Sequence, residues 1–272
     1  MSASLVGSVA RAIALLDAVA DSDGGARVRE LARRIGVNPS TASRLLGTLQ
    51  AGGLVEREPG GSYRLGLKLV ALSDRVLGQL DVRDRARPWL TWLVQETGET
   101  ATLSVPGGGE AITVDFVPSP SSVVSLARLG RPSVAHATAV GKVMLAFGAE
   151  VPRLDPPADL TAFTERTITD RAALSDELER VRRSVAAEAV GEREPDLNAL
   201  AAPVIGRGGE LVAILGLQGP AARLPASTRK ALRDPLLRAA RELGQALGGP
   251  GEEGPCPSAG APSTCAAWPT RS

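Results

Sequence analysis

The chain has 272 residues, of which 43% are hydrophobic and 22% charged, so it is long enough for two domains and too apolar for an intrinsically disordered protein. The formal net charge is +1, and no run approaches the roughly 18–20 consecutive apolar residues that cross a bilayer. Arg11 and Asp17 interrupt the N-terminal segment, unlike the apolar region of a signal peptide. We therefore expect a cytoplasmic protein with no membrane partner.

The first predicted element is a helix over residues 8–20. Val9, Ile13, Leu16 and Ala20 recur there on one face at helical spacing.

The next segment is typical of two helices joined by a sharp turn. Apolar residues recur at helical spacing from residue 28 onward, and Gly36 then supplies the left-handed residue that commonly ends a helix. Asn38 is a preferred N-cap, and Pro39 fits the first helical position because its missing N–H would have had no intrahelical partner. A third helix is therefore predicted to begin at Pro39 and to end near Ala51.

This third helix has two unlike faces. Apolar residues from Ala42 to Leu49 fall in one arc, and the opposite arc holds short polar side chains, a glycine and one arginine. Short side chains allow close approach to another surface, and an arginine can bind phosphate or read guanine in the major groove. The pattern favours a helix-turn-helix that binds DNA, with an ordinary three-helix bundle as the alternative. The outward arc consists of Ser40, Thr41, Arg44, Gly47 and Thr48.

Two short strand-like runs follow, Leu54–Glu58 and Tyr63–Leu65, with turn residues between them. A hairpin in this place makes a wing, on which Arg57 and Arg64 would contact phosphates without reading sequence. Residues 24–68 carry eight basic and three acidic side chains. Such a surplus is expected of a nucleic-acid partner, although a charge cluster is also typical of a solvated face.

The second half of the chain alternates helices and strands, which predicts an α+β fold with antiparallel hairpins able to enclose a pocket. Leu69, Leu72, Val76 and Leu80 predict a helix that links the two halves. The predicted helices beyond it span 82–97, about 138–147, about 170–187 with Thr169 as cap, and about 226–247. The predicted strands are 100–105, 111–117, 122–128, 199–205 and 211–218.

The sequence argues against catalytic and metal chemistry. Cys256 and Cys265 both lie in a Gly/Pro-rich tail that reads as disordered, so the folded part has no cysteine for zinc or nucleophilic chemistry. His136 is the only histidine, no G-x-S-x-G elbow surrounds a serine such as Ser133, and a lone histidine makes a poor zinc set. The Gly-rich runs PGGGE and GRGGE match neither a P-loop nor a dinucleotide fingerprint. We expect no catalytic residues, metal or cofactor.

From about residue 5 to residue 248, the chain resembles the IclR family of bacterial transcriptional regulators. The stretches LARRIGVNPSTASRLLGTLQAGGLVER and YRLGLKLVAL are similar to the DNA-binding half of that family. The stretches ARPWLTWLVQETGETATLSV, AHATAVGKVMLA, TITDRAAL and LAAPV with LGLQGPAARL are similar to its effector-binding half. The resemblance implies a winged helix-turn-helix domain at 1–65, a linker helix at 66–81, a GAF-like effector-binding domain at 82–248 and a tail at 249–272.

The resemblance also implies partners and site residues. The expected partners are double-stranded DNA with a palindromic operator, a small effector such as an organic acid, and further copies of the chain in a homodimer or homotetramer. Repression is the commoner mode of action. The groove and wing residues carried over are Ser40, Thr41, Arg44, Thr48, Arg57 and Arg64. The effector residues carried over are Ala139, Val140, Gly141, Asp196, Leu197, Ala199, Gly216 and Gln218.

A physical argument accompanies the first effector residues. Thr138 can cap a helix whose free N–H groups at Ala139 to Gly141 would anchor a carboxylate, although a plain helix start over a packing patch is the alternative. Asp196 stands where many relatives have glycine, and its carboxylate is expected to repel an acid unless it accepts a hydrogen bond from a hydroxyl or amine group of the ligand. Ala199 replaces a residue that is often Cys or Ser. Both departures argue against the usual small oxoacids as ligands.

The sequence therefore predicts a DNA-binding regulator controlled by a small ligand. The alternative is a DNA-binding regulator whose second domain only oligomerises and binds no effector.

Overall fold

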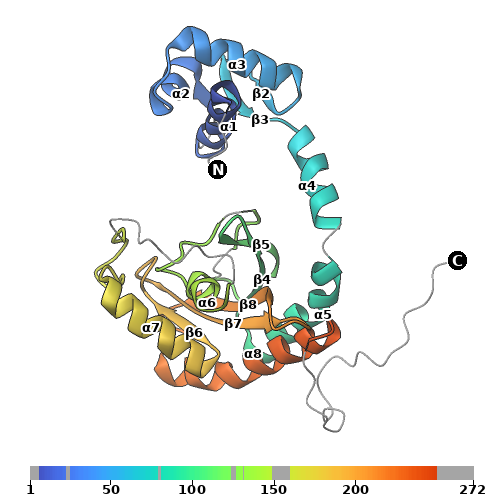
Figure 1. Cartoon of the computed structure of the whole chain (residues 1–272), viewed down its shortest axis with the longest axis vertical. Coiled ribbons are helices and arrows are strands. Elements are labelled where there is room, and N and C mark those ends of the chain that lie inside the picture. Colours follow the sequence, from blue (N-terminus) through green and yellow to red (C-terminus); the bar gives the residue numbers. More distant parts are fainter. Residues whose placement is uncertain are drawn as a thin grey trace, which may run out of the picture. The chain divides into compact units, whose positions relative to one another are not determined.

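The computed structural model describes two compact units, residues 1–80 and residues 81–272 (Figure 1). The predicted disordered tail, with Cys256 and Cys265, lies outside the described residues apart from Gly249. Among the helices that are described, none is long and apolar enough to cross a membrane. The described residues are 6–22, 25–78, 81–123, 127–130, 132–148 and 160–249, without the side chains of residues 74, 77 and 78.

The helices of the first unit are α1 (Gly7–Ala20), α2 (Val28–Arg34), α3 (Pro39–Ala51) and α4 (Lys68–Gly78). The turn between α2 and α3 confirms the local sequence signals. Gly36 has a φ of +68°, and the side chain of Asn38 accepts a 2.7 Å hydrogen bond from the N–H of Thr41. This bond satisfies one of the donors that have no intrahelical partner at the start of α3.

The wing is a three-stranded antiparallel sheet rather than a lone hairpin. Its strands are β1 (Ala26–Arg27), β2 (Val55–Arg57) and β3 (Ser62–Leu65), in the order β1-β3-β2. Tyr63 pairs with Ala26 on one side and with Arg57 on the other, and its ring is buried. The two-residue strand β1 has no sequence signal of its own, because two residues show no periodicity.

The core of the first unit lies between its helices and the wing. Leu15, Leu31 and Leu46 are fully buried, one from each of the first three helices. The apolar face that predicted α1 is not the packed one, because Val9 and Ile13 are both 55% exposed. This helix is apolar around most of its circumference, so periodicity alone could not select the face that packs.

The sheet of the second unit has five antiparallel strands in the order β5-β4-β8-β7-β6. They are β4 (Thr100–Gly107), β5 (Glu110–Val117), β6 (Ala187–Val190), β7 (Leu197–Ile205) and β8 (Leu211–Pro220). Because β4 pairs with β8, segments from both ends of the unit lie side by side at the centre of the sheet. The described part of the predicted strand at 122–128 is not a strand, and residues 124–126 are outside the description.

Helices cover both faces of this sheet. They are α5 (Asp81–Thr97), α6 (Ala139–Phe147), α7 (Arg171–Ser184) and α8 (Ala226–Ala246). Figure 1 shows α6 and α8 on opposite faces; α5 packs on α8 and on β4, and α7 packs on α6. Strand side chains alternate between the faces, so Ala199 and Ala201 of β7 pack toward α6.

Helix α7 is shorter than predicted. Asp170, not Thr169, caps it by accepting a 2.8 Å hydrogen bond from the N–H of Ala173. Its C-cap is Val185, with a left-handed φ of +55°, and β6 begins two residues later. The predicted helix therefore extended to the first residue of β6. The sequence did not mark the helix end, because the left-handed position after a helix is usually a glycine and here it is Val185.

Candidate functional site

Helix α3 presents its polar face to the outside of the first unit. Its apolar residues Ala42, Leu46 and Leu49 are buried against the unit's core, and this packing leaves Arg44 and Thr48 exposed on the other side. The remaining members of the predicted groove face also lie there: Ser40 and Gly47 are exposed, and Thr41 is half-buried.

The hydroxyl groups on this face are engaged locally, whereas its arginine is not. The Oγ of Ser40 donates to the side chain of Asn38 at 2.8 Å, and the Oγ1 of Thr48 donates to the carbonyl of Arg44 at 3.1 Å. The guanidinium of Arg44 has no hydrogen-bond or ion-pair partner among the described residues. All five of its N–H donors are therefore available to an incoming acceptor.

The two wing arginines differ from each other. The guanidinium of Arg57 lies 6.0 Å from the centre of the Tyr63 ring and has no ion-pair partner within the described chain. Arg64 instead donates from Nη2 to Glu56 at 2.9 Å. Its side chain is 60% exposed. The hydrogen bond from Arg64, with a smaller contribution from the Leu67 N–H, holds the pKa of Glu56 below its ordinary value. Arg64 therefore offers a phosphate less free charge than Arg57 does.

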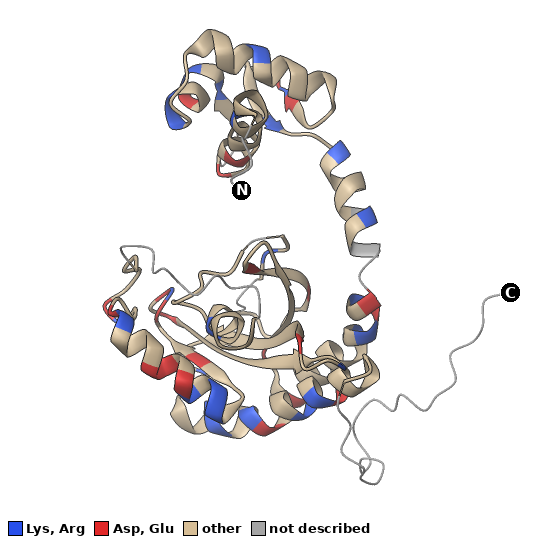
Figure 2. Cartoon of the chain, in the orientation of Figure 1, with Lys and Arg blue, Asp and Glu red and all other residues tan. Residues whose placement is uncertain are grey.

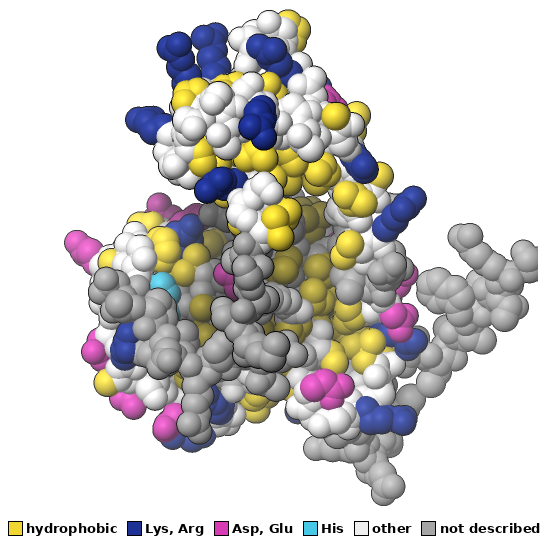
Figure 3. Space-filling view, turned by 45° about the horizontal axis from the view of Figure 1, so that its top comes forward, with side chains coloured by type: hydrophobic (Ala, Val, Ile, Leu, Met, Phe, Trp, Pro, Cys, Tyr) yellow, Lys and Arg dark blue, Asp and Glu magenta, His cyan; other side chains and the backbone are white. Residues whose placement is uncertain are grey.

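Further cations lie on this unit beyond the predicted ones. Arg27, Arg29 and Arg33 are exposed and make no ion pair with any described residue. Figure 2 shows basic residues on the ribbon of α2 and α3, and Figure 3 shows lysine and arginine side chains projecting from the same unit. The local surplus of positive charge was the only sequence signal for them.

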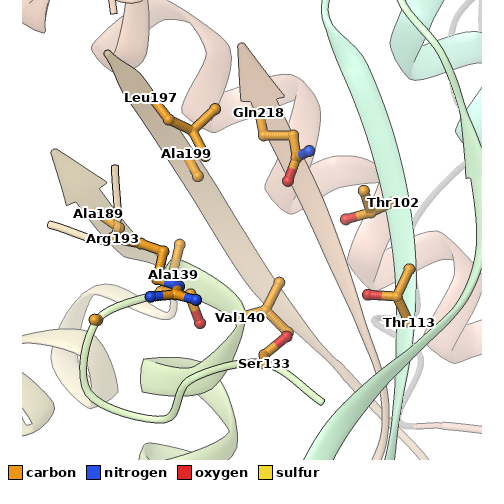
Figure 4. Close-up of a pocket in the computed structure, with 12 residues that line it drawn as sticks. Thr102, Thr113, Ser133, Ala139, Val140, Ala189, Arg193, Leu197, Ala199 and Gln218 are labelled. Atoms are coloured by element: carbon orange, nitrogen blue, oxygen red, sulfur yellow. The ribbon is translucent and has the colours of Figure 1, made fainter. Parts of the chain in front are cut away.

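The second unit contains a cavity of about 90 Å³ between the N-terminus of α6 and the sheet (Figure 4). Hydroxyl, amide and guanidinium groups line it together with small apolar side chains, and none of the described residues contributes an acidic side chain to the lining. Its lining residues are Thr102, Thr113, Ser133, Ala137, Thr138, Ala139, Val140, Ala189, Arg193, Leu197, Ala199 and Gln218.

The structure brings five of the eight predicted effector residues to this cavity: Ala139, Val140, Leu197, Ala199 and Gln218. It does not bring Gly141 there. The Gly141 N–H donates to Oγ1 of Thr138 at 3.0 Å, so the predicted cap exists but occupies this donor. A Cβ at residue 141 would lie 2.5 Å from the carbonyl of Val134, so the glycine allows α6 to start against that segment.

Asp196 and Gly216 are also absent from the lining. Asp196 is exposed and its side chain is not part of the cavity wall, and the expected repulsion of an acid stays a prediction. A Cβ on Gly216 would lie 2.5 Å from Oγ1 of Thr102 and 3.4 Å from Val140, which both line the cavity. Gly216 therefore does not line the cavity itself, but its missing side chain leaves room for Thr102 and Val140, which do.

Sequence reasoning found Gln218 but missed three other polar residues of the cavity wall, Thr102, Thr113 and Arg193. Thr102 and Thr113 come from the paired strands β4 and β5, and the Oγ1 of Thr113 shares a 3.3 Å hydrogen bond with Ser104. Alternation along β4 could have placed Thr102 on the α6 side of the sheet. Arg193 had no such signal, because it lies in the turn between β6 and β7, where no periodicity operates.

A buried ion cluster lies next to this turn. Lys142 of α6 is 1% exposed, and its Nζ lies 2.7 Å from Glu192 and 3.2 Å from Glu177. Burial raises the pKa of Glu177, but the hydrogen bond from Arg180 and the charges of Lys142 and Arg180 together hold it below its ordinary value. The Glu177 carboxylate is therefore ionised at neutral pH, and Lys142 has two acidic partners inside the domain.

Comparison with known proteins agrees with both halves of the chain. Residues 8–59 match the IclR helix-turn-helix domain, and residues 74–245 match the bacterial transcriptional regulator IclR C-terminal domain. The HTH-type transcriptional regulator XynR of Escherichia coli (strain K12) is 32% identical over 249 residues, which cover 90% of this chain and 99% of XynR.

Solved structures give the same result. An IclR transcriptional regulator from Alicyclobacillus acidocaldarius superposes with a TM-score of 0.75 at 26% identity, covering 90% of this chain and all of the other. An IclR homolog from Microbacterium hydrocarbonoxydans, complexed with 4-hydroxybenzoate, gives a TM-score of 0.70 at 26% identity, with 88% and 99% covered. With a helix-turn-helix unit, a sheet domain that holds a cavity, and family matches across both, the chain belongs to the IclR family of DNA-binding transcriptional regulators, which are not enzymes.

Proposed function

We propose that this protein is a sequence-specific repressor whose affinity for its operator changes when a small organic ligand binds in the second unit. The observation that carries the proposal is the cavity at the start of α6, which polar and small apolar side chains line, with no acidic side chain among the described residues. The 4-hydroxybenzoate complex of the Microbacterium homolog supports ligand binding as a use of this fold. The protein would act in the cytoplasm, where the chromosome is.

The DNA contacts follow from the exposed groups of the first unit. Helix α3 enters the major groove with Arg44 reading a base, while Ser40, Thr41 and Thr48 allow close approach. Arg57 and Arg64 of the wing contact the phosphate backbone. The free guanidinium of Arg44 supports its role as the specific reader, since no described residue competes for its donors.

Exposed apolar side chains on the first unit support pairing with a second copy. Val9 and Ile13 of α1, and Val70 and Val76 of α4, are each at least 55% exposed. A homodimer that covers them would bind a palindromic operator whose half-sites are separated by about one helical turn, or about 10 bp. Pairs of such dimers would give the tetramer.

A single acidic substitution on this exposed apolar surface tests whether the surface forms the dimer interface. Ile13→Asp should raise the dissociation constant for self-association, because the substituted side chain is exposed in one chain but would be buried in the dimer. Analytical ultracentrifugation measures the change, and Val123→Asp, at an equally exposed position of the second unit, is the matched control. Unchanged association of the Ile13 variant would exclude α1 from the interface.

The function itself is tested by fluorescence anisotropy on DNA from upstream of the protein's own gene, against scrambled DNA at about 0.15 M salt. We expect tight binding to the upstream DNA alone. Equal weak binding to both DNAs would contradict an autoregulatory operator at that place. A screen of small organic and aromatic acids then measures the thermal melt and the DNA affinity together.

Ligand control has a thermodynamic signature. A ligand that changes operator affinity must have its own affinity changed by operator DNA by the same factor. Equal ligand affinity with and without operator would contradict the coupling. A screen in which no compound moves either the melt or the DNA affinity would favour the alternative, in which the second unit only oligomerises.

A further inference from the structure

A groove of about 460 Å³ lies between α5 and α8, away from the cavity at the start of α6. The two helices pack side by side (Figure 1) and run antiparallel, since Arg85 near the start of α5 donates to the carbonyl of Ala246 at the end of α8 at 3.0 Å. The α5–α8 groove therefore has one end near the C-terminus of α8 and the other near the C-terminus of α5. Its lining residues are Trp92, Glu96, Asp234, Pro235, Leu237, Arg238 and Arg241.

The middle of the α5–α8 groove offers an indole ring and an unpaired donor. Trp92 is half-buried, and its ring makes an edge-to-face contact with Trp89, with 6.2 Å between the ring centres. The guanidinium carbon of Arg238 lies 5.6 Å from the centre of the Trp92 ring, and its Nε donates to Glu242 at 3.1 Å. Its Nη2 is buried and has no hydrogen-bond partner among the described residues. A backbone carbonyl of a docked segment would satisfy this donor, and the indole face suits proline rings.

The charge of the α5–α8 groove changes sign along its length. Arg241, at the end near the C-terminus of α8, is exposed and has no hydrogen-bond or ion-pair partner in the described part of the chain. Glu96 and Asp234, at the other end, are exposed and have no ion pair there either. A segment that enters the groove from the C-terminus of α8 should therefore begin with acidic residues.

The chain itself continues from that end of α8 with a segment of this kind. Gly249 is the last described residue. The sequence beyond it, residues 250–272, carries Glu252 and Glu253 first and then no charge until Arg271. The order of charges in this segment, acidic before basic, is complementary to that of the groove, basic before acidic.

The distances along the chain also fit. Arg241 precedes Gly249 by eight residues, which span about 12 Å at the helical rise of about 1.5 Å per residue. An extended chain covers about 3.3–3.6 Å per residue, so Glu252 and Glu253, the third and fourth residues after Gly249, reach about 10–14 Å. Pro255 follows two residues later, and Pro-rich segments bind aromatic-lined grooves in an extended conformation.

We propose that residues 250–272 bind in the α5–α8 groove of their own chain. The segment turns back along α8, so that its two glutamates pair with Arg241 and Pro255 packs on Trp92. It covers the half-buried indole ring and supplies the acceptor that Arg238 lacks. The inference stands apart from the proposed function, because the groove shares no lining residue with the cavity.

The test uses the native cysteines, because Cys256 and Cys265 are the two cysteines of the sequence and both lie in the segment. The full-length chain carries Cys265→Ser, Trp268→Phe and a bimane group on Cys256, whose emission an indole ring quenches on contact. Trp89 is 2% exposed, so the accessible quencher is Trp92. The emission should be lower by about half or more than in the same chain with Trp92→Phe, which corresponds to docking in at least half of the molecules. Equal emission from the two chains would overturn the proposal.

A charge swap assigns the contact to Arg241. Arg241→Glu should restore the emission, and adding Glu252→Lys and Glu253→Lys to that chain should bring the quenching back. Lys230→Glu is the matched control, because it reverses an exposed cation of α8 outside the groove. Retained quenching in Arg241→Glu, or equal relief of quenching in the control, would overturn the proposal.

A mixture of chains tests whether the segment binds its own chain. Labelled chains with Trp92→Phe are unfolded in urea and refolded together with an excess of unlabelled wild-type chains. The emission should stay unchanged, because each segment returns to its own groove, which lacks the quencher. A loss of emission would place the segment in the groove of a second copy and would overturn the proposal.

Discussion

The two units of this chain differ in their ion pairs, because only the second unit pairs its cations with buried carboxylates among the described residues. In the first unit the ion pairs, such as Arg34 with Glu30 and Arg64 with Glu56, join exposed partners. In the second unit Lys142, Arg87 and Arg223 each bind a carboxylate that is at most 10% exposed. Exposed pairs contribute little to stability, whereas a buried charge is costly to leave unpaired. Charge in the first unit is thus available to a partner, and charge in the second largely stabilises the fold.

The same contrast holds for apolar surface. The first unit leaves valine, leucine and isoleucine side chains exposed on α1 and α4, while the long buried strands of the second unit carry their apolar residues inside. An exposed apolar set on a small unit is typical of a surface that another molecule covers. The first unit is therefore built for contacts with other molecules, and the second mainly for contacts with itself.

The largest expected effect tests whether the second unit depends on its buried charges. Lys142→Met should lower the free energy of unfolding by about 3–5 kcal/mol, because it leaves Glu192 buried without its cation and removes one of the two cations that pair with Glu177. Urea unfolding followed by tryptophan fluorescence reports on this unit through Trp89 and Trp92 of α5.

The control for that experiment is Lys230→Met, an exposed lysine without an ion pair among the described residues. It should change the stability by no more than about 0.5 kcal/mol. Equal stability of the two variants would remove the contrast between the units.

The next effect concerns the first unit and should leave stability unchanged. Arg44→Ala should weaken binding to the specific operator by about 1–3 kcal/mol and relax the preference over scrambled DNA, because it removes a base contact. Arg57→Ala should weaken binding to all sequences alike and flatten the salt slope by about one, and Arg64→Ala by less, since Glu56 neutralises part of its charge. If the specificity ratio survives in Arg44→Ala, α3 presents a different face to the groove.

A gain of stability is expected in the second unit at Val185. A β-branched residue at φ +55° is strained, so Val185→Gly should stabilise the unit by about 1 kcal/mol and raise Tm by about 2–4 °C. Ala186→Gly is the control: Ala186 itself has no positive φ to relieve, so the substitution should lower Tm through chain entropy. DNA affinity should stay the same in both variants. A lower Tm for Val185→Gly would show that the packing of the valine side chain stabilises the unit by more than its positive φ destabilises it.

The smallest effect is a pH dependence. The folded pKa of Glu177 is depressed, so its stabilising contribution is fully present above the ordinary glutamate pKa of about 4.3 and is lost as pH falls through the lower folded value. Tm measured from pH 6 to pH 3 should therefore fall more steeply for the wild type than for Glu177→Gln. Parallel curves would mean that this carboxylate gains nothing from Lys142 and Arg180.

Much of the fold could be predicted where the cause is local. The Asn38-Pro39 start of α3, the turn at Gly36 and the Thr138 cap of α6 each depend on a few neighbouring residues, so the sequence contains the whole cause. The long strands β7 and β8 were equally visible, because a buried strand requires a continuous apolar run.

The candidate cavity was only half predictable. Family resemblance indicated Ala139, Val140 and Gln218, but it also indicated Asp196, which is exposed and does not line the cavity. Nothing in the sequence indicated Arg193, since its place on the wall results from the packing of its turn against Phe163. Contacts between segments that are distant in the sequence leave no periodic pattern of residues from which they could be predicted.

By itself, then, the sequence determined the order of the elements, the polar face of α3 and the class of the protein, because these follow from local periodicity, caps and matching stretches of residues. The tertiary structure decided which face of α1 is buried, that Lys142 pairs with two carboxylates inside the domain, and that Arg193 lines a cavity without an ion-pair partner among the described residues. Those outcomes depend on which distant surfaces meet when the chain packs, and a pattern along one segment contains no information about its partner.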